Sequence, residues 1–222
     1  GQSLLVHGAA GGVGVIAVQL AQAAGVEVFA TVGKQKKREF LESVLGVPAD
    51  HVLGSRSTEF AMRVHEKTQG RGVDIVLNSL AGEDFISKSI SSVAQGGWFI
   101  EIGRTGVWSK EQVAQVRPDI NYEIFDLGTA RAREPELCSE LLADLASRCA
   151  ECDGSGQSTR IKVWTEAFDI GDVVRAARHM QKSEHIGKVI VSHPRERPAV
   201  SSTGKYIITG GLEIGRASCR ER

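Results

Sequence analysis

Short apolar runs alternate along the chain with longer stretches in which apolar residues recur at helical spacing. Glycines and polar turn residues bound the apolar runs, which predicts strands at Ser3–His7, Val26–Val32, His51–Leu53, Val73–Asn78 and Trp98–Ile102. The stretches between them predict helices at Gly12–Ala24, Gln35–Leu45, Thr58–Thr68 and Gly82–Ala94. Strands that are apolar almost throughout and alternate with helices are typical of a parallel sheet covered on both faces. With a further strand at Ile120–Phe125 and a helix at Pro135–Ala150, we predict an α/β fold, a doubly wound parallel sheet over residues 1–153.

The pattern changes after a polar, glycine-containing loop near residue 153. Residues 154–192 predict a smaller unit made of the segment Ile161–Trp164, a helix at Ile170–Gln181 and a strand at Lys188–Ser192. This unit has too few apolar residues for a core of its own. We therefore expect it to be the C-terminal fragment of a second, substrate-binding domain that lies mainly upstream of Gly1.

The composition argues against several classes of protein. The 222 residues are 41% hydrophobic and 24% charged, and 27 Lys and Arg balance 27 Asp and Glu. This balance gives no overall field that would favour nucleic acid or an anionic membrane. No apolar run approaches the roughly 20 residues that span a bilayer, and strand-like sequence follows Gly1 without a leader. We expect a cytoplasmic protein that binds neither nucleic acid nor membrane.

The four cysteines and six histidines do not predict a metal or redox site. Cys149 and Cys152 have C-x-x-C spacing, but no second ligand pair completes a zinc site. No strand ends at the first cysteine, as a thioredoxin-like motif requires. We expect free thiols in a reducing compartment and no bound metal.

The most informative segment is a glycine-rich turn between the first strand and the first helix, Gly8-Ala9-Ala10-Gly11-Gly12-Val13-Gly14. Small residues let the backbone approach a pyrophosphate, whose charge is stabilised by the unpaired N–H groups at a helix N-terminus. A tight structural turn is the alternative, but strand, turn, helix and second strand follow in the order of a dinucleotide site. We predict that the cofactor is bound by Ala10, Gly11, Gly12, Val13 and Gly14.

The end of the second predicted strand indicates which dinucleotide binds. NAD sites usually have Asp or Glu there for the ribose 2′-hydroxyl, whereas this chain has Thr31-Val32-Gly33 and then Lys34-Gln35-Lys36-Lys37-Arg38. Cations suit the 2′-phosphate of NADPH, although a solvated helix surface also explains a charged run. Arg56 follows the third strand, and neighbouring strand ends converge at one edge of a sheet. We predict NADPH, bound also by Thr31, Gly33, Lys37 and Arg56.

Two more candidate ligands lie at the ends of later strands. Asn78 ends the fourth strand and Gly103 follows the fifth, at the carboxyl edge where open α/β sheets bind ligands. Asn78 could hydrogen-bond to the nicotinamide ribose. An ordinary turn residue at a strand end is an alternative that is nearly as well supported.

Four separated segments resemble those of a known family: Gly8–Gly14, Gly72–Leu80, Phe99–Gly103 and His185–Val189. From Gly1 to about Val191 the chain resembles the enoyl reductase domain of type I polyketide and fatty-acid synthases. That domain belongs to the zinc-independent, quinone-oxidoreductase-like branch of the medium-chain reductases and has a Rossmann nucleotide-binding half. The resemblance implies NADPH-dependent reduction of the α,β double bond of an enoyl thioester held on an acyl carrier protein. Lys37 matches the family's phosphate-binding lysine, and Arg56 matches a recurrent arginine.

The resemblance does not extend to the proton donor. The family's candidates are a lysine shortly after Asn-Ser-Leu-Ala and an aspartate after Gly-Lys-x, but Glu83, Asp84 and Gly106 stand at those positions. A tyrosine candidate in the family belongs to the substrate domain. Lys88, one helical turn further on, is our candidate catalytic residue, and a solvated helix lysine is the alternative.

The C-terminal residues resemble the start of another synthase domain. Lys205–Leu212 resembles the first strand and opening glycines of a ketoreductase domain, and residues 193–204 would be the linker before it. Residues 213–222 place a glutamate where that domain would bind phosphate, so we expect a non-native tail.

The expected partners follow from this resemblance. They are the acyl carrier protein and neighbouring synthase domains, and the resemblance also allows a homodimer. Two alternatives stay open: a free-standing quinone or alkenal reductase, and a non-catalytic reductase-like module. Without most of the substrate domain, we expect the chain to bind cofactor without turnover.

Overall fold

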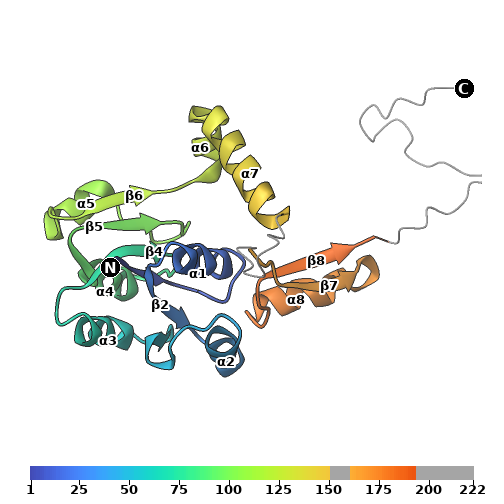
Figure 1. Cartoon of the computed structure of the whole chain (residues 1–222), viewed down its shortest axis with the longest axis horizontal. Helices are drawn as coiled ribbons and strands as arrows, with labels where there is room; N and C mark the ends of the chain where they lie inside the picture. Colours follow the sequence, from blue (N-terminus) through green and yellow to red (C-terminus); the bar gives the residue numbers. More distant parts are fainter. Residues whose placement is uncertain (151–160, 194–222) are drawn as a thin grey trace, which may run out of the picture.

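The computed structural model describes residues 1–150 and 161–193, and its main feature is a six-stranded sheet (Figure 1). The strands are β1 (Ser3–Val6), β2 (Glu27–Val32), β3 (Val52–Gly54), β4 (Val73–Asn78), β5 (Val93–Glu101) and β6 (Asn121–Ile124). The helices between and after them are α1 (Gly14–Ala23), α2 (Gln35–Ser43), α3 (Glu59–Lys67), α4 (Glu83–Ser91), α5 (Lys110–Val116), α6 (Leu127–Arg133) and α7 (Pro135–Ala150), with a 3₁₀ turn at Ala49–His51. All neighbouring strands are parallel, in the order β3-β2-β1-β4-β5-β6. This is the order of the Rossmann fold, so the predicted fold class is confirmed.

The two faces of this sheet carry separate apolar cores, because side chains alternate along each strand. Leu4 and Val6 of β1 pack on the face covered by α1 and α2. Leu5 packs on the other face, which α3, α4 and α5 cover. β1 is buried along its whole length, which explains the uninterrupted apolar run that predicted it. Because the strands are parallel and packed on both faces, the turns that follow them lie together at one fixed edge of the sheet.

Some predicted boundaries in this sheet were wrong. The fourth predicted helix ends at Ser91 rather than Ala94, and β5 begins at Val93 rather than Trp98. The register between β4 and β5 shifts near the start of the pair, and Gly96 adopts a φ of 74° there. This glycine-containing irregularity hid the first half of β5 from the sequence pattern. Helices α5 and α6 were not predicted.

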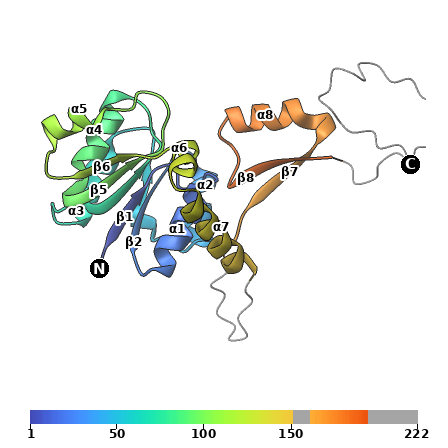
Figure 2. The ribbon, with the colours of Figure 1, turned by 90° about the horizontal axis from the view of Figure 1, so that it is seen from above.

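A second, parallel sheet of two strands forms a smaller unit: β7 (Thr165–Asp169) and β8 (Lys188–Ser192), with a 3₁₀ turn (Ile170–Asp172) and α8 (Val173–Gln181) between them (Figures 1 and 2). The segment Ile161–Trp164 precedes β7 and forms neither a helix nor a strand. Ile161 is buried, and Trp164 packs edge-on against Phe40 of α2, with ring centroids 5.0 Å apart. Trp164 thus joins the apolar core on the α1 and α2 face of the larger unit.

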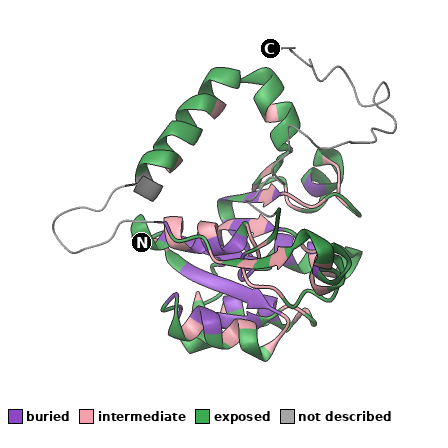
Figure 3. Cartoon of the chain, turned by 90° about the vertical axis from the view of Figure 1, so that its right-hand side faces the viewer, coloured by how far each residue is buried: buried purple, intermediate pink, exposed green. Residues whose placement is uncertain are grey.

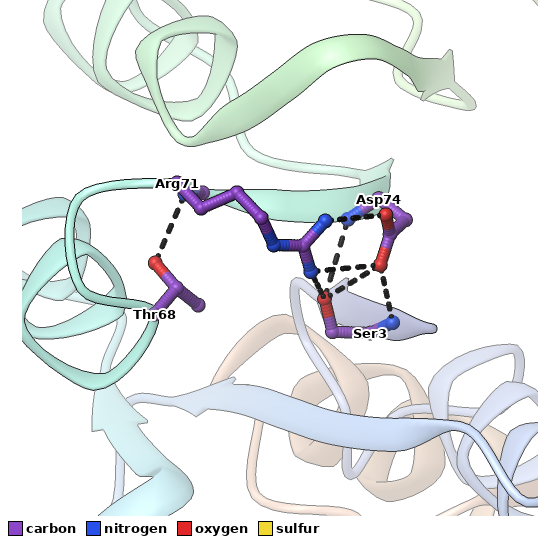
Figure 4. A network of polar contacts seen from close by, with 5 residues as sticks. Ser3, Thr68, Arg71 and Asp74 are labelled. Carbon is purple, nitrogen blue, oxygen red and sulfur yellow. Dashed lines mark hydrogen bonds and ion pairs between the residues drawn. The ribbon is translucent and has the colours of Figure 1, made fainter. Parts of the chain in front are cut away.

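A polar network fixes β1 to β4 at the edge of the sheet where the strands begin (Figure 4). The Asp74 carboxylate accepts hydrogen bonds from the backbone N–H and the hydroxyl of Ser3, at 2.7 and 3.0 Å. Both terminal nitrogens of the Arg71 guanidinium also donate to it. The hydrogen bonds from Arg71 lower the pKa of Asp74 most. Burial opposes this effect, and the hydrogen bonds from Ser3 lower the pKa further. This network is structural and lies at the opposite edge from the turns that follow the strands.

Helices α6 and α7 lie apart from the apolar cores. The described side chains of α6 and α7 are mostly exposed, and both helices stand away from the sheet (Figure 3). The predicted loop after residue 153, the linker, the ketoreductase strand and the C-terminal tail lie outside the described residues. The domain boundaries drawn from the sequence therefore stay predictions.

Candidate functional site

A hollow of about 480 Å³ lies at the carboxyl ends of β1, β2 and β3. It is lined by the turn after β1, the β2–α2 junction, the turn after β3 and the segment between α8 and β8. We call it the edge pocket. Its lining residues are Gly8, Ala10, Gly11, Val32, Gly33, Lys34, Lys37, Ser55, Arg56, Lys182, Ser183 and His185.

The floor of the edge pocket is built from the glycine-rich turn. Gly8 has a φ of 63°, and its carbonyl oxygen accepts a hydrogen bond of 2.8 Å from the N–H of Gly11. A Cβ at Gly14 would lie 2.5 Å from the oxygen of Gly8 and 2.6 Å from Cα of Ala9. Glycine is therefore required at Gly14 for α1 to start this close to the turn. The turn and the N-terminus of α1 together form a backbone cradle suited to an anion.

The walls of the edge pocket are strongly positive. Lys34, Lys37, Arg56 and Lys182 line it, and no carboxylate does so within the described part of the chain. Burial lowers the pKa of Lys37, and the charge of Lys34 lowers it further, while Glu166 acts in the opposite direction. Several cations with no carboxylate among the lining residues form a site suited to a multiply charged anion.

Backbone contacts hold the segment between α8 and β8 against the glycine-rich turn. The N–H of Gly187 donates a hydrogen bond of 3.0 Å to Ala10, and Gly187 pairs with Gly11 in a parallel bridge. Gly187 has a φ of 72°, and a Cβ there would lie 2.2 Å from the carbonyl oxygen of Trp164. Only glycine allows this approach, so the smaller unit is fixed directly to the site.

The structure brings several of the predicted cofactor ligands together. Those that line the edge pocket are Ala10, Gly11, Gly33, Lys37 and Arg56. Gly12, Val13 and Gly14 form the start of α1 beside it. Thr31 instead lies buried below the turn, with Oγ1 3.0 Å from Nδ1 of His7. Cofactor binding by all of these residues stays a prediction.

Asn78 and Gly103 lie at the ends of β4 and β5, but Asn78 is not free to bind a ligand. Its side chain is buried, and Nδ2 donates hydrogen bonds to the Leu80 carbonyl at 3.0 Å and to Oε2 of Glu101 at 2.6 Å. Glu101 is 1% exposed and also accepts a hydrogen bond of 2.6 Å from the N–H of Gly103. The geometry favours the alternative for Asn78, a residue that shapes the strand end.

The structure gives no support to Lys88 as a catalytic residue. It is exposed and lies in the last turn of α4. Its carbonyl oxygen accepts a hydrogen bond from the hydroxyl of Ser92, just before β5 begins. Because α4 runs back from the end of β4 to the start of β5, Lys88 lies toward the edge opposite the edge pocket. The geometry favours the alternative, a solvated helix lysine.

Sequence reasoning missed more than half of the residues that line the pocket. The lining residues that were not predicted include Gly8, Lys34, Ser55, Lys182, Ser183 and His185. Lys34 was visible as the first cation after β2, and His185 stands in a segment that carried the family resemblance. No local signal joins Lys34 to Lys182, 148 positions further on, although Nζ of Lys34 donates a hydrogen bond of 2.9 Å to the Lys182 carbonyl.

Two further hollows lie among the described residues. One, of about 410 Å³, lies beside β3 and is lined by charged side chains that include Arg38, Asp50 and Lys67. A mostly apolar hollow of about 820 Å³ lies between the end of β6, α6 and α7. Residues 1–150 and 161–193 contain no group of three or more His, Cys, Asp or Glu side chains arranged to hold a metal ion. Within those ranges, no helix combines the length and apolar character required to cross a membrane.

Comparison with known proteins gives a consistent result. The chain matches the family model described as zinc-binding dehydrogenase over residues 12–147, more than half of its 222 residues. Over 98% of its length it is 35% identical to the highly reducing polyketide synthase pspA of Penicillium soppii. The chain spans only 9% of the length of that relative.

Two solved structures are also similar. The CurF ER cyclopropanase from the curacin A biosynthetic pathway shares 44% sequence identity with a TM-score of 0.78, and the match covers 87% of this chain and 55% of that one. The CurK enoyl reductase shares 42% identity with a TM-score of 0.77, again over 87% of this chain and 55% of that one.

Proposed function

We propose that this chain, which belongs to the enoyl reductase domains of polyketide synthases, is the NADPH-binding part of an enzyme that reduces enoyl thioesters. The family gives the reaction class, oxidoreductase, and a nicotinamide cofactor. The substrate would be held on an acyl carrier protein, within a longer synthase that contains neighbouring domains. The observation that carries the choice of NADPH is the edge pocket. Lys34, Lys37 and Arg56 lie there at the ends of β2 and β3, Lys182 comes from the segment after α8, and no carboxylate of the described residues lines it.

The residues of the edge pocket fit NADPH better than NADH. A site for NADH needs a carboxylate near the end of β2 to bind the ribose 2′-hydroxyl, but Val32 and Gly33 stand there. A Cβ at Gly33 would lie 3.2 Å from Oγ of Ser55 and 3.5 Å from Nε of Arg56. Side chains that donate hydrogen bonds therefore cover the position that a carboxylate would need. Such donors suit a phosphate.

Different parts of the pocket would bind different groups of NADPH. When bound, NADPH supplies the hydride for the reduction. Lys34, Lys37 and Arg56 would hold the 2′-phosphate through charge-assisted hydrogen bonds. A phosphate there would also offset the repulsion between Lys34 and Lys37, which adds to the effect of burial in lowering the pKa of Lys37. The turn Gly8–Gly14 would hold the pyrophosphate with backbone N–H groups at the N-terminus of α1.

The ends of β4 and β5 would keep the reactive edge rigid. Ligands of open α/β sheets bind across the carboxyl edge of the strands, and buried Glu101 joins Asn78 to the N–H of Gly103 at that edge. Such a fixed edge helps to orient reactants. We assign no proton donor among the described residues, so proton delivery falls to the rest of the substrate half or to solvent.

We assign β7, α8 and β8 to that substrate half. A two-stranded sheet is at best marginally stable alone, and several apolar side chains of α8 and β8 are exposed: Val173, Val174, Met180, Ile190 and Val191. These surfaces are what an upstream part of a longer chain would cover. In that arrangement the isolated chain binds cofactor but lacks most of the site that orients the substrate.

One alternative has a specific observation in its favour. Glu83 and Asp84 occupy the region where the family has its candidate lysine, and Lys88 is exposed. A reductase-like module that binds the nucleotide without turnover would look the same at these positions.

The test is a cofactor-oxidation assay on the longer synthase that contains this chain, with an enoyl thioester on the acyl carrier protein. We expect turnover with NADPH. Lys37→Ala and Arg56→Ala should each raise the KM for NADPH about tenfold or more, because each removes a charged hydrogen bond worth about 1.5–3 kcal/mol. They should leave the KM for NADH unchanged. Lys36→Ala is the matched control, since Lys36 is exposed in the same run and outside the pocket lining.

Other outcomes would contradict the proposal in distinct ways. NADPH binding without reduction of any substrate indicates the non-catalytic module. Reduction of quinones or alkenals but not of the thioester indicates the free-standing type of activity.

A further inference from the structure

The edge pocket has walls from two different sheets. Its floor and two walls come from the six-stranded sheet, whereas Lys182, Ser183 and His185 come from the segment that joins α8 to β8 in the smaller unit. A ligand that reaches both sides of this pocket touches both units. The segment from the smaller unit adds the ammonium group of Lys182 and the imidazole of His185 to the cations of the larger unit.

Polar contacts fix this segment next to the cations of the pocket. Nζ of Lys34 donates a hydrogen bond of 2.9 Å to the Lys182 carbonyl and lies 3.5 Å from Oε1 of Glu184. Oε1 of Glu166 in β7 accepts a hydrogen bond of 3.1 Å from the N–H of Ile186. The residues around His185 are thus held in place before any ligand arrives, which reduces the entropy lost on binding.

The charges around His185 favour an anion as the ligand of this part of the pocket. His185 is partly buried, and its Nδ1 has no hydrogen-bond partner among the described residues. Burial, followed by the charges of Lys37 and His179, lowers the pKa of His185, while Glu166 opposes this. Glu166 itself pairs with His179, with Oε2 2.7 Å from Nε2. The nearby carboxylates do not neutralise all of these cations. An anion in the pocket would offset the remaining positive charge.

We propose that the segment Lys182–His185 is part of the 2′-phosphate site, so that the 2′-phosphate of NADPH joins the nucleotide-binding unit to the smaller unit. Lys182 and His185 are then specificity-determining residues, which act on NADPH and not on NADH. This inference rests on the proposed function, because it requires NADPH to occupy the edge pocket.

The proposal predicts a linkage between cofactor choice and the contact of the two units. A ligand that binds both units stabilises their contact, and one that binds only the first does not. NADPH should therefore slow hydrogen exchange in β7, α8 and β8, whereas NADH at equal saturation should slow exchange only around the glycine-rich turn. NADPH and NADH differ only in the 2′-phosphate, so this contrast would be due to that group.

The test is titration of the full 222-residue chain with NADPH and with NADH, followed by hydrogen exchange at saturation. Lys182→Ala and His185→Gln should each weaken NADPH binding about tenfold and leave NADH binding within about twofold of the parent chain. They should also remove the NADPH-specific protection of β7, α8 and β8. Arg178→Ala, an exposed position on α8 outside the pocket lining, is the control and should change neither measurement.

The outcomes separate this inference from the proposed function. If Lys37→Ala abolishes the NADPH preference while Lys182→Ala and His185→Gln have no effect, this inference is wrong and the proposed cofactor stands. Equal protection of the smaller unit by NADH and NADPH also overturns the inference. If the parent chain binds both nucleotides equally, the proposed cofactor specificity fails, and the inference fails with it.

Discussion

Acidification should destabilise the fold through His7, which is buried directly below the glycine-rich turn. Its Nδ1 lies 3.0 Å from Oγ1 of Thr31, and its Nε2 lies 2.9 Å from Oγ of Ser89. Because the Ser89 hydroxyl donates to the carbonyl of Phe85, it accepts from Nε2–H of His7. Nδ1 then accepts from the Thr31 hydroxyl. This arrangement satisfies a neutral imidazole on both nitrogens.

The size of the effect follows from the pKa. Burial lowers the pKa of His7 from 6.5 to about 3. A lowered pKa means that the unfolded chain takes up a proton which the folded chain does not. The stability contributed by neutral His7 is therefore complete above pH 6.5 and falls as the pH drops toward 3. Each pH unit in this window costs about 1.4 kcal/mol, so a change from about pH 7.5 to about pH 5 costs about 2 kcal/mol.

Urea unfolding of the parent chain and of His7→Gln at these two pH values measures this contribution. Other groups titrate as well, so the relevant quantity is the difference between the two chains. We expect the parent to lose about 2 kcal/mol more than His7→Gln between the two pH values. His65→Gln, at a partly exposed histidine in α3, should behave like the parent. Identical losses in the parent and in His7→Gln would refute the reasoning.

Three further changes test other parts of the site. Gly14→Ala places a Cβ 2.5 Å from the Gly8 oxygen, so thermal unfolding should show a loss of more than about 1 kcal/mol and nucleotide titration a loss of affinity. Glu101→Gln replaces one carboxylate oxygen by an NH₂ group where Glu101 now accepts two hydrogen bonds, one of them from Gly103. Chemical unfolding should show a loss of about 1–3 kcal/mol. Lys88→Ala should leave the reductase rate of the longer enzyme unchanged, and a large loss of rate would restore Lys88 as a catalytic candidate.

Strong local patterns made most of the larger unit predictable. The apolar run of β1 and the small residues that follow it leave few alternatives to a strand, a tight turn and a helix. The same pattern could not show where β5 begins, because Gly96 interrupts it with a backbone irregularity. Helix α5 did have a local signal, a capping box formed by Ser109 and Gln112. That signal was overlooked in a short, mainly polar segment.

The candidate site was predictable only where its residues follow a strand end. Lys37 and Arg56 were placed together because β2 and β3 are neighbours in the sheet, and both line the pocket. The contribution of Lys182 and His185 depends on how a distant unit docks, which no local pattern specifies. Trp164 shows the same limit, since its apolar side chain packs against Phe40 of the larger unit.

The most direct test of the central claim is the ratio of NADPH to NADH affinity, measured by calorimetry on the chain itself. The positive edge pocket predicts that NADPH binds at least about tenfold tighter than NADH, and that Lys37→Ala removes most of this preference. A folded chain that binds NADH as tightly as NADPH, or whose preference survives Lys37→Ala, would contradict the account.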